Sequence, residues 1–383
     1  MTRMDQVQTP IIPVIGGMIR EVPGTISLGQ GVVHYGPPPQ AVVAVQAALA
    51  RPSTHDYHDG AGLPALLDAI ARKLWAENRI DVSQGSRVMV TAGANMAFMH
   101  AVLATTAPGD EVILPVPFYF NHEMAVEMAG CRVIQVPTDE HYQLLPDAIA
   151  RAVTNRTRAV VTISPNNPSG AVLSEKSLRE VNVLCRDLGL YHIADEPYEY
   201  FTYGSARHVS PGSFPDAAAH TISMYSLSKA YGFAGWRIGY VVYPDHLASA
   251  MMKSQDTILI CATIASQEGA IAALDVGRSY CQPHVRELAT IRDIVVQKLS
   301  QLAPLATVPA ADGAFYVLLK VNTGLDPLHL AERLIREYKV AVIPGTAFGM
   351  TEGCYFRVAY GALQRETVAE GIGRLVNGLR AIV

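Results

Sequence analysis

The residues best suited to covalent chemistry in this 383-residue sequence lie in Ser226-Leu-Ser-Lys229 and, just beyond it, Gly235-Trp-Arg237. Lys229 follows an apolar run, so it is poorly placed to be a solvated surface charge. Burial lowers the pKa of a lysine, and the resulting neutral amine can attack an aldehyde to form a Schiff base. Alone, a Ser-x-x-Lys segment is structural more often than catalytic. With Arg237 and Ser226 available for an anion, the segment suggests a phosphorylated aldehyde as cofactor.

A carboxylate follows another apolar run, in the segment Ala194-Asp-Glu-Pro-Tyr198. We expect Asp195 at the C-terminal end of a strand, which is where open α/β sheets bind ligands. A buried carboxylate needs a cationic partner, and a protonated pyridine nitrogen would be one and would keep the ring an effective electron sink. Taken alone, the segment favours the alternative, an aspartate that caps a helix or faces solvent.

Two turns after predicted strands could bring further polar groups to the same place. Ser164-Pro-Asn-Asn-Pro-Ser-Gly170 predicts a rigid turn, from which Asn167 could point its amide toward a phenolate oxygen. In Val90-Thr-Ala-Gly-Ala-Asn-Met-Ala97, a strand runs through Gly93 into a helix whose first backbone N–H groups could cradle a phosphate. Each segment by itself is as well explained as an ordinary turn.

Taken together, these segments resemble the class I and II aminotransferases, which are fold-type-I enzymes that depend on pyridoxal 5′-phosphate (PLP). Leu28-Gly-Gln-Gly31 with Pro37-Pro-Pro39 is most similar to the kynurenine/glutamine/methionine aminotransferase branch. The resemblance is collinear and covers nearly the whole chain. The matches are Gly29, Tyr57, the Gly93-Ala94 turn, Pro117-Phe-Tyr119, PNNPSG, DEPY, SLSK, GWRIG and Tyr355-Phe-Arg357.

The resemblance implies a role for each matching residue. Lys229 would hold PLP as the internal aldimine and carry the proton between Cα and C4′. Tyr57 would reach the phosphate in a neighbouring subunit, which implies a homodimer with shared sites. The other expected cofactor contacts are Gly93, Ala94, Asn95, Ser226 and Arg237 at the phosphate, Asp195 at the pyridinium nitrogen, Asn167 and Tyr198 at the ring hydroxyl, and Tyr119 on the ring face.

The substrate α-carboxylate would be bound by Arg357, with Asn167 and the Gly31 backbone beside it. A guanidinium is suited to this task because its planar fork can engage a carboxylate bidentately. Arg357 alone could be a surface arginine, but its apolar neighbours in the segment FRVAY favour a buried, paired one.

Departures from the family pattern affect the expected specificity. Aspartate aminotransferases of bacteria often have a lysine after the phosphate turn for the distal carboxylate, whereas Asn95-Met96 supplies no cation here. The kynurenine branch commonly has an aromatic residue where Asn95 stands, and Val32-Val33-His34 replaces its Phe-Pro-Asp, so its aromatic selectivity is not transferable. Four histidines could line the pocket, although a surface or core position is the better interpretation of each. They are His34, His55, His58 and His122.

The elements that must position these residues alternate between short β-branched runs and longer helical patterns. Such alternation predicts an α/β domain with a mostly parallel central sheet flanked by helices. The predicted strands are residues 87–90, 111–115, 132–136, 158–163, 191–194, 221–225 and 238–242. The predicted helices include residues 96–104, 145–152 and 175–188, the last capped by Ser174.

The pattern after about residue 280 is typical of a smaller α+β domain. It predicts helices at 283–302 and 327–338, strands at 314–321, 340–343 and 355–358, and a terminal helix. The first forty residues are rich in Pro and Gly, and we expect an irregular arm there. The predicted division is therefore an arm at 1–40 packing on the body, a large PLP-binding domain at 41–280 and a small C-terminal domain at 281–383.

Composition excludes several other classes of protein. Half of the residues are hydrophobic and the formal net charge is −4, which argues against a disordered chain and against a dedicated nucleic-acid binder. Five widely separated cysteines without a Cys-x-x-Cys pair predict neither a disulfide framework nor a zinc site, so no metal is expected. With no signal-peptide layout and no apolar run of about 20 residues, we expect a soluble, cytoplasmic protein without a membrane partner.

The expected function is a PLP-dependent aminotransferase that moves an amino group from an L-amino acid, with a neutral or aromatic side chain, to a 2-oxo acid. One site would serve two half-reactions in a ping-pong mechanism through the Lys229 aldimine. A PLP-dependent C–S lyase or decarboxylase would use the same Lys229 and Asp195, so these stay open as alternatives. A PLP-binding regulator is a remote alternative, because no helix-turn-helix pattern precedes the body.

Overall fold

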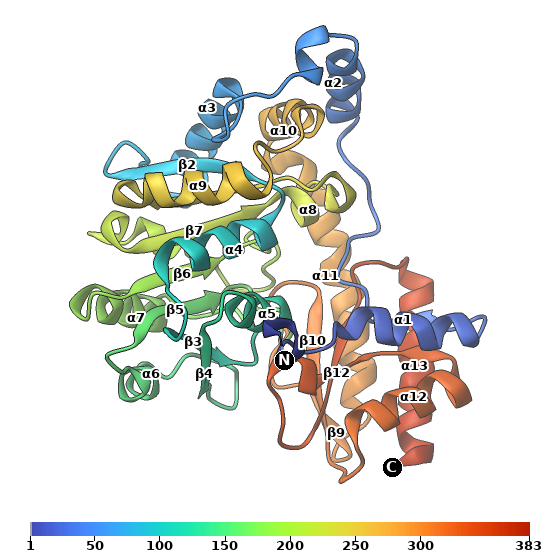
Figure 1. Cartoon of the computed structure of the whole chain (residues 1–383). Helices are drawn as coiled ribbons and strands as arrows, with labels where there is room; N and C mark the ends of the chain where they lie inside the picture. Colours follow the sequence, from blue (N-terminus) through green and yellow to red (C-terminus); the bar gives the residue numbers. More distant parts are fainter. Residues whose placement is uncertain (1) are drawn as a thin grey trace.

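The computed structural model describes residues 2–383, and its larger part is built around a seven-stranded sheet (Figure 1). The strand order is β2-β8-β7-β6-β5-β3-β4, and neighbours are parallel except at β8, which is antiparallel to β2 and β7. The strands are β2 (Ser86–Thr91), β3 (Glu111–Val116), β4 (Arg132–Pro137), β5 (Thr157–Ile163), β6 (Tyr191–Asp195), β7 (Thr221–Ser226) and β8 (Gly239–Pro244). The seven predicted strands are confirmed to within two residues at each end, and so is the mostly parallel sheet.

Helices follow the strands and cover the sheet. In Figure 1, α4 and α9 lie across it, and α4 contacts β7, β8 and α9. The helices of this part are α2 (Pro39–Leu49), α3 (Pro64–Lys73), α4 (Ala94–Thr105), α5 (Phe120–Met128), α6 (Pro146–Ala152), α7 (Glu175–Asp187), α8 (Leu227–Ala230), α9 (Ala248–Ile258) and α10 (Ile264–Val276). The predicted cap of α7 is confirmed, since Ser174 Oγ accepts a hydrogen bond from the Ser177 backbone N–H at 3.1 Å.

A smaller antiparallel sheet with the order β12-β13-β10-β9 forms the other part of the molecule. Most of its apolar side chains, and those of α12 and α13, belong to one continuous core cluster, whereas Leu318 and Tyr355 pack in a separate small one. The elements are α11 (Arg278–Ser300), β9 (Ala306–Thr307), β10 (Tyr316–Val321), α12 (Pro327–Tyr338), β11 (Val340–Ala341), β12 (Ile343–Pro344), β13 (Cys354–Ala359) and α13 (Arg365–Ile382).

Two predictions for this part need correction. The helix predicted from residue 283 begins at Arg278, so Pro283 lies inside α11. It does not occupy the first helical position, at which the missing N–H of a proline would be harmless. The single strand predicted at 340–343 is two short strands with different partners. β11 pairs with β1 (Ile26–Ser27), whereas β12 pairs with β13.

The prediction of an irregular N-terminal segment was wrong for residues 11–21, which form α1 (Ile11–Glu21). Ile11, Ile15 and Ile19 recur at helical spacing and pack against the core, and Pro13 falls in the first turn, where it is tolerated. α1 contacts α12 and β12, and Figure 1 shows it beside the smaller part of the molecule. The domain boundaries at residues 40 and 280 stay predictions.

Cys131, Cys185, Cys281 and Cys354 are buried as small apolar side chains, and Cys261 is partly buried. All five lie in the described range, and no disulfide joins them. Across residues 2–383 there is also no helix with the length and apolar character that crossing a membrane requires.

Candidate active site

Most of the residues singled out in the sequence meet in one cavity of about 120 Å³, here called the Lys229 cavity. It lies where β5, β6 and β7 end and α4 begins, because parallel strands bring their carboxyl ends to the same edge of a sheet. Its lining residues are Ala94, Asn95, Tyr119, Ile163, Asn167, Asp195, Pro197, Tyr198, Ser226, Ser228, Lys229 and Arg237. The structure thus brings together nearly all of the predicted cofactor residues.

Lys229 reaches this cavity from the short helix α8, which starts directly after β7. Ser226 caps α8 by accepting a hydrogen bond from the Ser228 backbone N–H at 3.1 Å. Lys229 Nζ donates to the Gly31 carbonyl oxygen at 2.5 Å. Burial, with smaller contributions from Arg357 and Arg237, lowers the pKa of Lys229 to about 8, against the opposing effect of Asp195. At pH 7 about a tenth of the amine is therefore uncharged and nucleophilic, far more than for a lysine with a pKa of 10.5.

Asp195 is the last residue of β6, and its side chain is almost fully buried. This burial excludes the solvent-facing aspartate that the segment alone favoured. Asp195 Oδ2 lies 3.1 Å from His122 Nε2, and the His122 ring stacks on Phe98 with centroids 4.1 Å apart. Asp195 Oδ1 is buried and has no hydrogen-bond partner among residues 2–383. Because an unpaired buried carboxylate oxygen is unfavourable, Oδ1 is available for a donor on a bound group.

Arg357 comes from β13 and is 2% exposed, so it is a buried arginine, as its apolar neighbours predicted. Its Nη1 donates to Asn167 Oδ1 at 2.9 Å and its Nη2 donates to the Gly29 carbonyl oxygen at 2.7 Å. Its Nε is buried and has no partner in the described part of the chain. The guanidinium therefore keeps a free donor next to Asn167, which lines the Lys229 cavity.

Tyr316, a residue of β10, completes this side of the site. Its hydroxyl lies 2.9 Å from the Tyr198 hydroxyl, and the Arg357 guanidinium lies 4.9 Å from its ring centroid. Burial, with the neighbouring Tyr316, raises the pKa of Tyr198 well above its ordinary value, so the Tyr198 hydroxyl stays protonated and can donate. Any side chain at Gly31 would meet the Tyr316 hydroxyl, because an added Cβ would lie 2.7 Å from it.

The start of α4 forms an anion-binding end of the cavity. Gly93, the N-cap residue, has φ +79°, and an added Cβ would lie 2.6 Å from Arg237 Nη2. No side chain caps α4, so its first backbone N–H groups are free to bind an anion. Arg237 adjoins this turn, where it donates to the Ala92 carbonyl oxygen at 3.1 Å. A phosphate here would be bound by helix N–H groups, a guanidinium and the nearby Ser226 hydroxyl.

Tyr57 and the four histidines lie outside the lining of the Lys229 cavity, and of these histidines His122 contacts Asp195, which lines it. The Tyr57 side chain is 80% exposed, beyond the short helical turn Pro52–His55. His55 and His58 make local contacts to the carbonyl oxygens of Leu49 and Ser53. His34 lies near Glu287, with 3.3 Å between Nε2 and Oε2.

Sequence reasoning missed several functional neighbours. His122 was considered as a pocket residue but a surface or core position was preferred, and it is a buried histidine that also contacts Asp195. The sequence spacing could have indicated this contact, because His122 lies three residues after Tyr119. At the start of α5, this spacing directs both side chains to the same region. Tyr316 had no signal, because it reaches the site only through the pairing of β10 with β13.

A buried polar network lies beneath the DEPY segment and was also missed. Lys73 Nζ donates to Glu199 Oε1 and Oε2 at 2.5 and 2.6 Å and to Asn78 Oδ1 at 2.7 Å. Asn78 Nδ2 donates to Ser210 Oγ at 2.8 Å, and Ser210 in turn donates to Glu196. These paired charges support the wall of the site without lining the Lys229 cavity.

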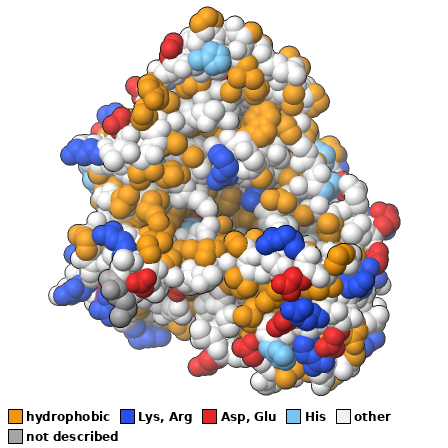
Figure 2. Space-filling model, turned by 45° about the vertical axis from the view of Figure 1, so that its right-hand side comes forward, with side chains coloured by type: hydrophobic (Ala, Val, Ile, Leu, Met, Phe, Trp, Pro, Cys, Tyr) orange, Lys and Arg blue, Asp and Glu red, His pale blue; other side chains and the backbone are white. Residues whose placement is uncertain are grey.

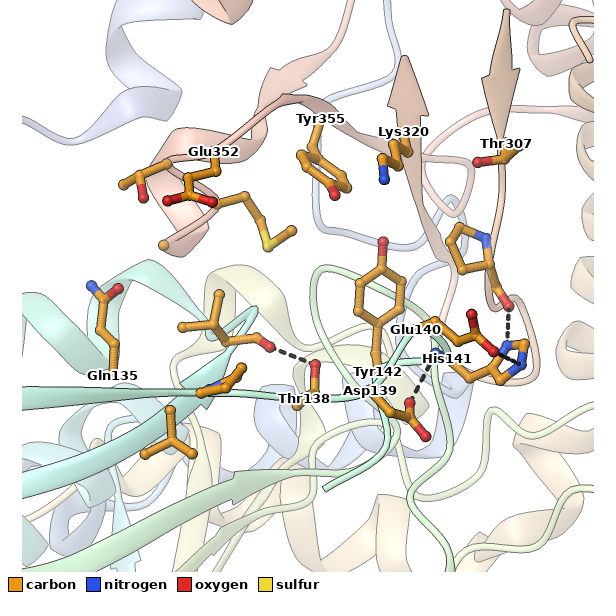
Figure 3. A pocket seen from close by; sticks show the side chains of 17 residues that line it. Gln135, Thr138, Asp139, Glu140, His141, Tyr142, Thr307, Lys320, Glu352 and Tyr355 are labelled. Carbon is orange, nitrogen blue, oxygen red and sulfur yellow. Dashed lines mark hydrogen bonds and ion pairs between the residues drawn. The ribbon is translucent and has the colours of Figure 1, made fainter. Parts of the chain in front are cut away.

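A second cavity, of about 790 Å³, lies between the turn after β4 and the smaller sheet (Figure 3). Figure 3 shows the Tyr142 and Tyr355 rings pointing toward each other across it, with Lys320 beside Tyr355. Its acidic side chains include the exposed Glu140. Among the described residues, none that lines the Lys229 cavity lines this one, so we assign the candidate chemistry to the Lys229 cavity.

Comparison with known proteins agrees with this geometry. A family model described as aminotransferase class I and II matches residues 23–375. The aromatic aminotransferase ISS1 of Arabidopsis thaliana is 35% identical over 98% of this chain and 94% of its own length. A probable aspartate/prephenate aminotransferase of Aquifex aeolicus is also 35% identical, over 93% of this chain and 91% of its own.

Solved structures show the same fold. Pyrococcus protein-A1 superposes with a TM-score of 0.94 at 32% identity, covering 99% of this chain and 98% of that one. A single mutant of Thermus thermophilus aspartate aminotransferase superposes with a TM-score of 0.91 at 29% identity, covering 99% of both chains. Together with the mostly parallel sheet, these similarities establish the fold-type-I architecture.

Proposed function

The chain belongs to the class I and II aminotransferases, which are PLP-dependent enzymes, and from this premise we propose that it transfers the amino group of L-amino acids with neutral or aromatic side chains to a 2-oxo acid. When bound, PLP supplies an aldehyde that takes up the amine and a pyridinium ring that withdraws electrons from the substrate Cα. One observation carries the proposal: Lys229 and Asp195 line one cavity, Asp195 Oδ1 has no partner among residues 2–383, and the Arg357 guanidinium is bound to Asn167 in the wall of that cavity.

The residues present fit PLP at each of its polar groups. Asp195 Oδ1 needs a donor, which a protonated ring nitrogen would provide, and His122 fixes the other carboxylate oxygen. The phosphate would lie at the start of α4, bound by the backbone of Gly93, Ala94 and Asn95. Tyr198 and Asn167 would hydrogen-bond the ring hydroxyl and Tyr119 would pack on the ring, while Ser226 and Arg237 would complete the phosphate site.

Lys229 performs two tasks in this proposal. Its amine would attach the cofactor, and the same Nζ, when it is free, would take the proton from the substrate Cα and hold it for return to the product. The lowered pKa suits both tasks, because a general base acts best when its pKa is close to the working pH.

Arg357 binds and orients the substrate through its α-carboxylate. Its buried Nε has no other partner within the described residues, and a carboxylate could engage Nε and one Nη in parallel. Asn167 holds Nη1 and the Gly29 carbonyl oxygen holds Nη2, so the guanidinium plane is fixed before substrate arrives. The Gly31 backbone, whose carbonyl oxygen accepts a hydrogen bond from Lys229 Nζ, would contact the same carboxylate. Such preorganisation holds Cα within reach of Lys229.

The proposed preference for neutral side chains is electrostatic. A second carboxylate that enters a desolvated pocket needs a cation, and Asn95-Met96 at the start of α4 supplies none. In the lining of the Lys229 cavity, taken over residues 2–383, the cations are Lys229 and Arg237, which both have other roles. Arg278, a possible alternative, lies against the Tyr200 ring at 5.5 Å. The relatives include aromatic and aspartate aminotransferases, so kinship alone does not decide the substrate.

We also propose that the active enzyme is a homodimer with shared sites and that it works in the cytoplasm. Tyr57 is exposed here and would contact the phosphate of a second copy. Other large hydrophobic side chains are exposed on α2, among them Val43 and Leu49. Figure 2 shows hydrophobic side chains, in orange, over the upper part of the molecule, where Figure 1 places α2 and α3. A homodimer contact over this region would cover them.

The test is a comparison of amino donors with one common 2-oxo acid acceptor. We expect kcat/KM to be at least about tenfold higher for methionine, glutamine or phenylalanine than for aspartate, since a tenfold preference requires only about 1.4 kcal/mol. The first half-reaction, followed alone by loss of absorbance of the Lys229-bound cofactor, should give the same order. Aspartate ahead of all three would show that a cation for the distal carboxylate exists.

A further inference from the structure

Two histidines and a glutamate that are far apart in the sequence meet next to the loop that follows Gly31. His34 belongs to this loop, and His284 and Glu287 are three residues apart on α11, so both project from one face of that helix. One donor atom from each of the three side chains lies within 4.8 Å of the other two. His34 Nε2 and Glu287 Oε2 are 3.3 Å apart.

We propose that His34, His284 and Glu287 bind one divalent transition-metal ion, of which Zn²⁺ is the best match. Two imidazoles and one carboxylate form a common zinc donor set, in which a fourth position stays open to water. Zinc–ligand bonds of about 2.0–2.2 Å put two ligands roughly 3–4 Å apart, so the longest separation must shorten by about 1 Å. Rotation of the Glu287 side chain, which is 44% exposed, can supply this change.

The environment of the two imidazoles supports a built site. The His34 side chain is 10% exposed, and its buried Nδ1 has no partner within the residues that the structure describes. The His284 ring stacks on Tyr35 with centroids 3.8 Å apart and an angle of 10° between the planes, which fixes its orientation.

Because of its position, a metal ion in this site would restrain the loop that follows Gly31. Tyr35, between His34 and the rest of the loop, donates its hydroxyl to the Lys229 backbone carbonyl at 2.9 Å, and Gly31 accepts a hydrogen bond from Lys229 Nζ. A metal ion on His34 and α11 would therefore tie this loop to α11 beside Lys229. The inference does not depend on the proposed substrate preference. No metal was expected from the sequence, because its five cysteines include no Cys-x-x-Cys pair.

The experiment measures zinc binding by the untagged, PLP-loaded full-length protein after removal of metals with a chelator. Equilibrium dialysis against micromolar ZnCl₂, with the bound metal quantified by mass spectrometry, should give one Zn²⁺ per chain. We expect Glu287→Gln and His284→Ala to weaken this binding at least about tenfold, since each removes a direct ligand. Glu287→Gln keeps the packing of the site, so it reports on ligation even if His284→Ala disturbs the Tyr35 stack.

His141→Ala is the matched control. His141 is exposed and lies 3.7 Å from Glu140, so it offers a histidine–glutamate pair without a third ligand. This variant should retain one Zn²⁺ per chain. Zinc should also raise the Tm of the wild type and of His141→Ala, but not of Glu287→Gln. A wild type that binds no zinc, or a stoichiometry and affinity unchanged in Glu287→Gln and His284→Ala, would overturn the proposal.

Discussion

Lys229 is subject to opposing electrostatic effects, since burial and two arginines lower its pKa while Asp195 raises it. The resulting pKa of about 8 lies well below the value of 10.5 that an exposed lysine has. The sequence predicted this behaviour from position alone, because SLSK follows an apolar strand. Asp195, Asn167 and Arg357 were assigned through the family resemblance, since the segments of Asp195 and Asn167 alone favoured ordinary structural roles. The sequence did not identify His122 or Tyr316 as partners, because their contacts depend on the packing of distant segments.

The first prediction at this scale concerns the site of PLP attachment. Borohydride reduction of the PLP-loaded enzyme followed by peptide mapping should find the label on Lys229, because it is the buried lysine in the cavity. Lys229→Ala should lose the label. Lys253→Ala, which removes an exposed lysine on α9, is the control and should keep it. Label on any other lysine would refute the assignment.

The second prediction concerns pH. The rate at which PLP attaches to the cofactor-free enzyme should rise with pH and level off above a midpoint near 8, because only the neutral amine of Lys229 attacks the aldehyde. Since the pKa is lowered, the reactive form is already present in part at pH 7 and is fully present above about pH 9. Stopped-flow absorbance provides the profile. A midpoint near 10.5 would mean that Lys229 is solvated like a free lysine.

At the scale of elements, the sequence predicted what depends on local pattern. The seven strands of the large sheet were found because they are short β-branched runs, several of them apolar on both faces, and α7 because Ser174 marks its start. The helix α1 was missed because Pro13 and two glycines masked its apolar spacing, and β11 and β12 because strand partners cannot be read from one segment. The strands that end at the site, β5, β6 and β7, could be predicted because their sequence pattern is local. Parallel strands then bring their carboxyl ends to the same edge of the sheet.

The buried network beneath the DEPY segment supports a stability prediction. Lys73→Ala should lower the free energy of unfolding by about 3–5 kcal/mol, because it leaves the carboxylate of Glu199 buried without its cation. Thermal unfolding followed by circular dichroism measures the change. Arg72→Ala is the matched control: its partner Asp275 is exposed, so its Tm should stay close to that of the wild type. Equal Tm values for the two variants would show that Glu199 finds another partner or water.

At the scale of the whole molecule, the proposed dimer joins residues of two chains in each site. The sequence suggested this only through the resemblance that assigns Tyr57 to a neighbouring subunit. In the single chain, Tyr57 and several apolar side chains of α2 are exposed. The single chain therefore does not test the prediction, which requires an experiment that combines two different chains.

Mixed dimers provide that test. Dimers formed from Tyr57→Phe and Lys229→Ala chains contain one site free of both substitutions, because Tyr57 of one chain serves Lys229 of the other. Random mixing should leave about a quarter of all sites intact, so activity should exceed the average of the two parents. Activity equal to that average would show that Tyr57 acts within its own chain or not at all.

The most direct test of the whole account follows the amino nitrogen itself. Wild-type enzyme with PLP, ¹⁵N-methionine and an unlabelled 2-oxo acid should produce the amino acid of that acceptor carrying ¹⁵N, in equal amount to the 2-oxo acid formed from methionine. Lys229→Ala should produce neither. Release of ¹⁵N as ammonium with loss of the sulfur group, or loss of CO₂ without transfer, would contradict the account, because it would show that the site performs elimination or decarboxylation in place of amino transfer.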